Sequence, residues 1–598
     1  MKSSEVANRN SLILFLGSSM LVMLFGAAGF HAAYPDKTYL DALYCSLQLF
    51  TLNSGAIDGT TPWPLEIARW LAPLTLAGGA LGAMRLFFGE RWNLWRARRM
   101  SGHHVICGLG EKGWALAEGL LKLKEKKVVA LDPNPDSEYA ASFCKAGGLL
   151  LKIKASGRIE LIAVNVAKAH SLIAVTNKDA DNLALALAAA ELAEEADRKG
   201  PPLDICTHIG SVAYRDLLDR NAFLEASSQP GSSIRTFNYH ANLARILLDE
   251  NPLDTAGHPD GATNLARKIH LFLSDLCDSA TALLIHVSRT GHYSAGRKVH
   301  VHLITQCASK LLKSLKLRYP GLVLCVASLE ASDAEDTEDA NEFSHKAATL
   351  IQNSAQDCFT VFPAFSSDPG RLDDILRLHE CVPQGTGFRM PIPMSLKSLL
   401  ASVVSRQPSL AARLAEFRSP QNCCGSSVVF NEDLDRRAIS IRKGWLAENA
   451  KQIGKAEERG DLEKVTKLKS KPTYNKQWGE LTEEQKDSNR SQADHISLKI
   501  RTAGHTPDIT AKAWHEWCAT SPNVVESLSR MEHERWMAHA YLAGWTYAAQ
   551  RDDSKKQHPD LVPYDLLDDG SKEFDRKTVE GLADYLAAGQ NGSSLAPQ

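Results

Sequence analysis

The chain has 598 residues, 44% of them hydrophobic, and its 68 basic and 70 acidic side chains leave a formal net charge of −2. This near balance gives no electrostatic case for a nucleic-acid partner, and none is expected. The twelve cysteines are scattered without a C-x-x-C pair, a pattern typical of free thiols in a reducing compartment.

Two apolar segments at the amino terminus predict a transmembrane hairpin, with spans at about residues 11–30 and 64–88. No charged residue occurs from Ser11 to Phe30, and about 20 apolar residues in a helix cross a bilayer. No A-x-A cleavage site precedes Tyr34, and a second apolar stretch follows, so an uncleaved anchor is favoured over a signal peptide. The hairpin is expected to occupy residues 1–100.

Basic residues flank both ends of this hairpin, which predicts a multi-pass protein of the plasma (inner) membrane with both termini in the cytosol. These residues are Lys2, Arg9, Arg91, Arg96, Arg98 and Arg99. Small residues in the second span form small-xxx-small pairs, namely Gly78, Gly79, Gly82 and Ala83. They predict either association between subunits or close packing within one hairpin, and both alternatives stay open.

The segment between the spans, residues 37–56, is too polar for a third span and too apolar for an ordinary loop. It predicts a short amphipathic helix that re-enters the membrane. In position it resembles the pore helix and filter of two-span potassium-channel-type proteins, which implies ion conduction. The candidate pore-like residues are Thr51, Asn53, Ser54 and Gly55. Because Thr-Leu-Asn-Ser-Gly replaces the Thr-Val-Gly-Tyr-Gly filter, potassium selectivity has no support here.

Residues 101–250 alternate strand and helix patterns, which predicts an α/β, doubly wound parallel sheet. A strand at 103–107 leads into the glycine-rich turn 108–113, a helix at 111–124 and a strand at 127–131 that ends at Asp132. Further strands are expected at 149–153, 171–176 and 204–208. This spacing is typical of a dinucleotide site, in which a helix amino terminus faces the diphosphate and a carboxylate accepts from ribose hydroxyls.

The glycine turn, Asp132 and the stretch A-H-S-L-I-A-V-T-N-K-D-A-D-N at 169–182 resemble the RCK, or TrkA amino-terminal, domain over about residues 103–245. The resemblance implies an adenine nucleotide or NAD(H) as cofactor. The residues expected to bind it are Gly108, Gly110, Gly113, Asp132, Thr176 and Asn177. Lys154-Ala155-Ser156 replaces the Gly-Asp-Ala of the family, so the ligand stays open, and a Rossmann domain kept only for assembly is the alternative.

A second, degenerate Rossmann-like domain is expected at 265–380, followed by a linker and helices at 381–471. Apolar runs alternate with helix-like stretches, but Ser274–Asp278 stands where a G-x-G turn would follow the first strand. Such a copy can pack and dimerise without binding phosphate. The acidic run 333–339 lacks the central glycine and the spacing of an EF-hand loop, so no metal is predicted there.

Residues 472–590 contain Met531–Tyr547, H-P-D-L-V-P-Y at 558–564 and F-D-R at 574–576, and they resemble the RyR domain, a small, mainly helical repeat first named from ryanodine receptors. Cations for phosphate and flat rings for a base could form a nucleotide pocket. The candidate residues are Arg535, Trp536, His539, Trp545, Arg551, His558 and Tyr564. The alternative is that these aromatics are core residues and the charges structural.

No nucleophile, base and orienting group occur together, so no catalytic residue and no enzyme activity are predicted. We expect a ligand-gated ion channel or channel-like membrane effector, assembled as a homotetramer and regulated by a small nucleotide ligand. The main alternative is a non-conducting, membrane-anchored nucleotide sensor or scaffold, including a membrane-disrupting defence effector. A dehydrogenase is a distant third.

Overall fold

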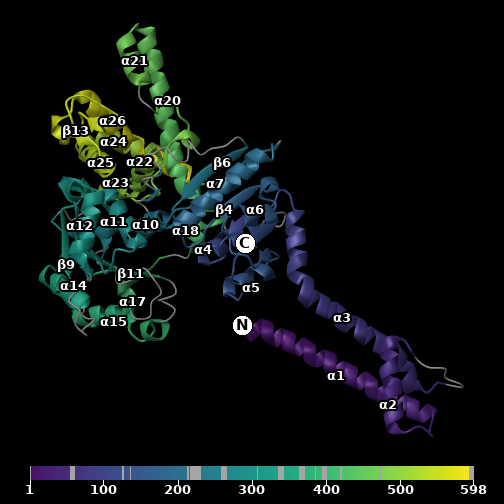
Figure 1. Cartoon of the computed structure of the whole chain (residues 1–598). Coiled ribbons are helices and arrows are strands. Elements are labelled where there is room, and N and C mark those ends of the chain that lie inside the picture. Colours follow the sequence, from purple (N-terminus) through teal and green to yellow (C-terminus); the bar gives the residue numbers. More distant parts are fainter. Residues whose placement is uncertain are drawn as a thin grey trace.

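The structure is a computed structural model that describes most of the chain (Figure 1). The described residues are 2–53, 61–123, 127–134, 136–198, 200–211, 214–215, 218, 231–256, 266–305, 307–333, 342–362, 371–383, 386–393, 400–417, 420–470 and 473–590.

Two long helices form a hairpin that projects away from the rest of the molecule, with a short helix at its far end (Figure 1). The long helices are α1 (Lys2–Ala33) and α3 (Trp63–Arg98). Between them lie the short helix α2 (Tyr39–Gln48) and the 3-10 turn η1 (Leu49–Thr51). Glycines allow the close packing: a Cβ at Gly29 would lie 2.6 Å from the backbone nitrogen of Leu65. The buried Ser46 hydroxyl donates to the carbonyl of Met23 on α1 at 2.8 Å.

Within the described residues, length and composition qualify one helix to cross a membrane, over Phe15–Ala33 of α1. The prediction of two spans is therefore supported for α1 alone, and the second span, in α3, stays a prediction. Near the start of α3, Glu66 and Arg69 form an ion pair at 3.1 Å. Within the hairpin, a Cβ at Gly79 would collide with the ring of Phe15, which supports packing inside one hairpin at that position.

The first α/β unit is a parallel six-stranded sheet with the order β3-β2-β1-β4-β5-β6, which confirms the Rossmann-like fold. Its strands are β1 (His104–Cys107), β2 (Val128–Leu131), β3 (Leu149–Leu151), β4 (Ser171–Ala174), β5 (Leu203–His208) and β6 (Ser232–Phe237). Its helices are α4 (Glu111–Lys122), α5 (Glu138–Lys145), α6 (Arg158–Ala163) and α7 (Asp179–Glu195). The edge strand β6 is an addition to the predicted strands.

A second parallel sheet has the order β10-β7-β8-β9. Its strands are β7 (Ile269–Leu273), β8 (Val299–Thr305), β9 (Ser328–Asp333) and β10 (Cys358–Phe362). The helices around it are α11 (Asp278–Thr290), α12 (Ala308–Arg318), α13 (Leu322–Cys325), α14 (Glu342–Asn353) and α15 (Arg371–Cys381). Beyond them, the segment expected to be linker and helices also contains the parallel pair β11 (Met390–Pro393) and β12 (Leu414–Phe417).

The rest of the chain is mainly helical, which confirms a helical carboxy-terminal region. Linking helices are α10 (Tyr239–Glu250), α17 (Pro408–Arg413), α18 (Pro420–Cys424), α19 (Ser426–Phe430), the turn η6 (Asp433–Asp435), α20 (Arg436–Glu458) and α21 (Leu462–Lys469). The terminal helices are α22 (Glu483–Asp494), α23 (Ile496–Thr502), α24 (Ala511–Thr520), α25 (Pro522–Leu542), α26 (Asp569–Glu580) and α27 (Leu582–Gln590), with the short pair β13 (Thr546–Tyr547) and β14 (Gln557–His558). Figure 1 shows α20 and α21 extending away from the body.

Candidate functional site

The glycine-rich turn lies between β1 and α4, and each of its three glycines has a different environment. Gly108 has φ +99°, a conformation that favours glycine, and a Cβ there would lie 3.0 Å from the carbonyl oxygen of Val175. Gly113 packs directly against the carbonyl of Gly108, so a side chain would not fit. Gly110 is the N-cap of α4, with φ −79°, and a Cβ added there would have no heavy atom within 4 Å. The turn thus leaves the amino terminus of α4 open to a phosphate.

Asp132, at the end of β2, is bound to this turn. Its Oδ2 accepts a hydrogen bond from the backbone nitrogen of Leu109 at 2.7 Å, and its Oδ1 accepts from that of Asn134 at 2.7 Å. A carboxylate has about four acceptor positions. Asp132 therefore orders the turn and keeps acceptor capacity for ribose hydroxyls.

Thr176 and Asn177 follow β4, on the other side of the turn. The backbone nitrogen and the hydroxyl of Thr176 both donate to Oδ1 of Asn182, at 2.7 and 2.8 Å. The fully buried Asn182 also donates to the carbonyls of Thr176 and His208, at 3.1 and 3.0 Å. Asn182 therefore fixes the ends of β4 and β5, a role that the sequence analysis did not assign. Asn177 is exposed beyond it.

Polar groups that the sequence analysis did not select continue the site past β5. Lys112, in the glycine turn, is half-buried with its Nζ 5.5 Å from the ring centre of Tyr239, and burial lowers its pKa. The buried His208 has no hydrogen-bond partner at Nε2 within the described chain, and burial lowers its pKa well below the usual value. His240 lies 6.2 Å from it and forms a 2.7 Å hydrogen bond with Ser279 of α11. These residues are distant in sequence, so no local motif indicates them.

The seven candidate residues of the carboxy-terminal region fall into two groups. Arg535 and His539 face inward on α25. The guanidinium of Arg535 is 2% exposed, forms a 2.8 Å ion pair with Glu532 and donates to the hydroxyl of Ser491 at 2.8 Å. Burial lowers the pKa of His539 to about 3, so its ring is neutral at pH 7. The expectation that these two side chains supply free positive charge to a ligand is therefore corrected.

The outer group contains Trp536, Trp545, Arg551 and His558, whereas Tyr564 belongs with the buried residues. The ring of His558 lies 5.0 Å from Trp536 and 6.1 Å from Trp545, edge to face. The exposed Arg551 lies 5.7 Å above Trp545, and its Nη1 is 3.3 Å from Nε2 of His558. Tyr564 is buried beside His533, with ring centres 5.9 Å apart. Ligand binding by this aromatic and cationic surface remains a prediction.

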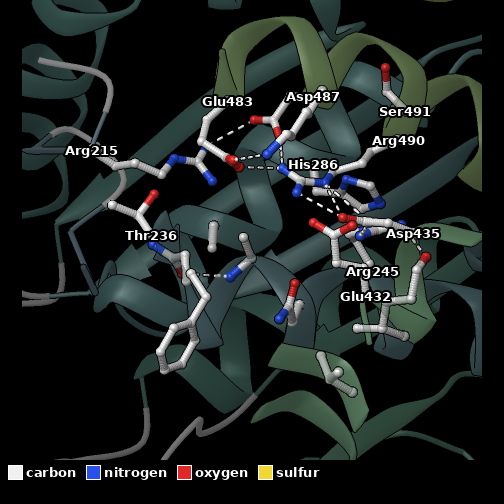
Figure 2. A pocket seen from close by; sticks show the side chains of 18 of the residues that line it. Arg215, Thr236, Arg245, His286, Glu432, Asp435, Glu483, Asp487, Arg490 and Ser491 are labelled. Carbon is white, nitrogen blue, oxygen red and sulfur yellow. Dashed lines mark hydrogen bonds and ion pairs between the residues drawn. The ribbon is translucent and has the colours of Figure 1, made fainter. Parts of the chain in front are cut away.

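Helix α22 connects this region to the two sheets through buried ion pairs around a cavity of about 80 Å³, room for a few water molecules (Figure 2). Arg490 contacts three carboxylates, those of Asp435, Glu483 and Asp487, at 2.8, 2.7 and 2.9 Å. Asp487 also pairs with Arg215, which follows β5, at 2.9 Å, and with Arg289 of α11 at 3.0 Å. The helical region is therefore held to both sheets by charge.

In the pore-like segment, the described residues cap the short helix at the tip of the hairpin. The Thr51 hydroxyl and the backbone nitrogen of Asn53 donate to the carbonyl of Gln48, at 2.9 and 3.2 Å, around Leu52 at φ +62°. Ser54 and Gly55 lie outside the described residues.

Comparison with known domains agrees with this geometry. Residues 104–225 match the family model of the TrkA-N domain. Residues 519–590 match that of the RyR domain. The chain thus contains both domains, and the RyR match covers the later part of the predicted segment 472–590.

Among solved structures, a mutant of GsuK is 15% identical, with a TM-score of 0.36, and covers 72% of this chain and 100% of its own. GsuK bound to ADP is 14% identical with a TM-score of 0.35, covering 71% and 100%. The GsuK channel bound to NAD is 13% identical with a TM-score of 0.37, covering 71% and 84%. Such TM-scores are too low to assign a fold or function to this chain.

Proposed function

We propose that this protein is a nucleotide-regulated, membrane-anchored channel or channel-like effector. Its TrkA-N domain binds an adenine nucleotide or NAD(H), and its RyR domain acts as a second sensor. The observation that carries this proposal is the way α3 of the hairpin enters the core of the TrkA-N domain.

The last turns of α3 are packed beneath the first sheet. Ala97 is fully buried in the core that includes Val105 of β1, with Leu94 and Met100 packed against it. The side-chain amide of Asn165 donates to the carbonyl of Met100 at 2.8 Å. Because α3 ends at Arg98 and β1 begins at His104, the connection is too short to absorb a rotation of the sheet. Ligand-dependent movement of the domain would therefore reach the helix.

Exposed apolar surface on both helices supports a membrane location. Leu21 on α1 is 57% exposed, and Trp70, Leu74 and Leu81 on α3 are 74, 65 and 67% exposed. Apolar area of this kind requires lipid or another subunit to cover it. The proposal therefore includes both helices as membrane spans, with cytosolic termini, in a plasma-membrane homotetramer.

The open glycine turn supports the choice of ligand. The free amino terminus of α4 suits a diphosphate, and Asp132 suits a ribose on the β2 side. Lys112 and His208 extend the polar surface on the β5 side, which offers room for contacts beyond a single nucleoside. ADP and NAD⁺, the ligands named for the GsuK structures, are suitable probes. No catalytic step is part of the proposal.

The segment after α2 supports an alternative without selective conduction, because Thr51-Leu52-Asn53-Ser54-Gly55 is no potassium filter. In that case the protein is a non-conducting, membrane-anchored sensor or scaffold, and one form of it is an effector that disrupts the bilayer. Purified protein in sealed liposomes separates these functions: ion flux with retention of a trapped dye supports a channel, dye release supports membrane disruption, and neither signal under any nucleotide supports a scaffold.

A further inference from the structure

The carboxyl-terminal end of α3 has two different faces. Leu94 and Ala97 pack into the core of the first sheet, and Ala97 is fully buried. The opposite face is exposed and carries four arginines and two tryptophans, namely Arg91, Trp92, Trp95, Arg96, Arg98 and Arg99. At about 100° per residue these six positions cover roughly 160° of the helix surface, and Leu94 and Ala97 fall outside this arc. We call these six residues the basic face of α3.

The positive charge of the basic face is not neutralised within the chain. No acidic residue occurs between Arg91 and Arg99. Among the described residues, none of the four arginines forms an ion pair with a carboxylate. Glu90, which precedes them, instead pairs with Lys152, after β3, at 3.4 Å. The four guanidinium groups are therefore available to an anionic partner.

The two tryptophans form a flat apolar surface between these charges. Their rings are stacked, with centres 4.8 Å apart and an angle of 20° between the planes. Trp92 is 58% exposed and Trp95 is 43% exposed, and the guanidinium of Arg99 lies 4.1 Å from the ring centre of Trp95. An indole has an apolar body and one N–H donor, which suits the interface between membrane and water. A guanidinium group binds phosphate oxygens with two parallel hydrogen bonds.

The length of α3 places the basic face at the edge of a membrane, provided that α3 spans it as proposed above. The helix has 36 residues, about 54 Å, whereas the hydrocarbon core is about 30 Å thick. The second span is expected to end at about residue 88, so Arg91 lies about 5 Å farther along the helix, at the level of the head groups. Arg98 lies about 10 Å beyond Arg91, close to the Debye length of about 8–10 Å, and its long side chain can reach back.

We propose that the basic face of α3 binds the head groups of anionic phospholipids. The guanidinium groups pair with lipid phosphates, and the stacked rings of Trp92 and Trp95 cover the apolar side of the head-group layer. A nucleic acid is also anionic, but the apolar helices that continue from this face favour a lipid. Because the other side of the same turns is buried in the TrkA-N core, the bound lipid lies at the joint between the membrane and the nucleotide-binding domain.

The test is native mass spectrometry of the full-length protein in neutral detergent, titrated with dioleoyl phosphatidylglycerol and separately with dioleoyl phosphatidylcholine. Each arginine near the membrane surface contributes roughly fivefold in affinity for an anionic lipid. The wild type should therefore prefer phosphatidylglycerol by more than about 25-fold, and the double variant Arg91→Gln/Arg98→Gln should lose about 25-fold of that affinity. Binding of phosphatidylcholine should stay unchanged.

A control variant removes the same charge elsewhere. Lys455→Gln/Arg459→Gln changes two exposed residues at the end of α20, which extends away from the body (Figure 1), and should bind both lipids as the wild type does. A second measurement needs no variant: raising the ionic strength from about 0.05 to about 0.5 M should reduce the preference of the wild type at least fivefold, because salt screens exposed charges.

Equal affinity of the wild type for the two lipids overturns the proposal, and so does an unchanged affinity for phosphatidylglycerol in Arg91→Gln/Arg98→Gln. The proposal is also overturned if that variant loses affinity for a single-stranded oligonucleotide and not for the lipid. A protein that stays in solution without detergent contradicts the membrane location and the lipid site together. A protein that needs detergent but does not distinguish the two lipids contradicts the lipid site alone.

Discussion

The substitution Gly110→Ala should weaken nucleotide binding without destabilising the fold, because the added methyl group contacts no protein atom. Gly110 has a negative φ and nothing within 4 Å of the added Cβ. Alanine at an N-cap lowers the free energy of unfolding by about 0.5 kcal/mol relative to glycine. Because alanine also lowers the conformational entropy of the unfolded chain, it raises the free energy of unfolding by about 0.4–1 kcal/mol. The free energy of unfolding without ligand should therefore change by less than about 1 kcal/mol.

The same methyl group lies where a diphosphate would approach the amino terminus of α4. Steric displacement of about 1–3 kcal/mol predicts a Kd that rises roughly 5- to 150-fold. Calorimetric titration with ADP and NAD⁺ measures this directly. In thermal unfolding, ligand at 100 times the wild-type Kd stabilises the wild type by about 2.7 kcal/mol, and about 1–2.4 kcal/mol of this gain should disappear in the variant at the same ligand concentration.

Gly113→Ala is the contrasting control. Its Cβ would collide with the backbone carbonyl of Gly108, so about 1–3 kcal/mol of stability should be lost without any ligand. The reasoning is refuted if Gly110→Ala binds both nucleotides as tightly as the wild type, since the ligand would then lie elsewhere. It is equally refuted if Gly110→Ala unfolds as readily as Gly113→Ala.

Three further changes test the other parts of the structure. Arg490→Ala leaves three buried carboxylates without their shared partner and should cost about 3–5 kcal/mol in urea unfolding, a result contradicted by a loss below 1 kcal/mol. Burial opposes ionisation of Asp435, but Arg490 and Arg245 outweigh it and lower its pKa to about 2, below the ordinary 3.8. The ionised carboxylate of Asp435 therefore adds about 2 kcal/mol to the free energy of unfolding above about pH 4, and this stabilisation is lost as the pH falls toward 2. In Asp435→Asn, this part of the pH dependence of stability should be absent. Arg551→Ala, on an exposed side chain, should leave unfolding within about 0.5 kcal/mol of the wild type while weakening any nucleotide binding by the RyR domain, as calorimetry with ADP would show.

Local patterns made much of the first domain predictable. The strand, glycine turn, helix and acid lie within about 30 residues, and contacts between residues this close in the chain can be predicted from the spacing of residue types. Strand β6 was missed because it is an edge strand whose residues are only partly buried. The ion pair between Arg215 and Asp487 joins residues 272 positions apart, and no periodicity links them.

The candidate pocket of the RyR domain was predicted only in part from its residue types. Arg535 and Trp536 are adjacent on α25, and successive helical residues point about 100° apart. Arg535 therefore turns inward to Glu532, whereas Trp536 turns toward His558. Residue types can suggest a ligand, but the helical phase decides which side chains meet it.

Coupling between nucleotide and membrane helices is tested most directly by ion flux in liposomes, measured against nucleotide concentration for the wild type and Gly110→Ala side by side. We predict that flux changes with ADP or NAD⁺ in the wild type and that the variant needs at least fivefold more ligand for half of the effect. Flux that is the same at every nucleotide concentration in both proteins would contradict the coupling.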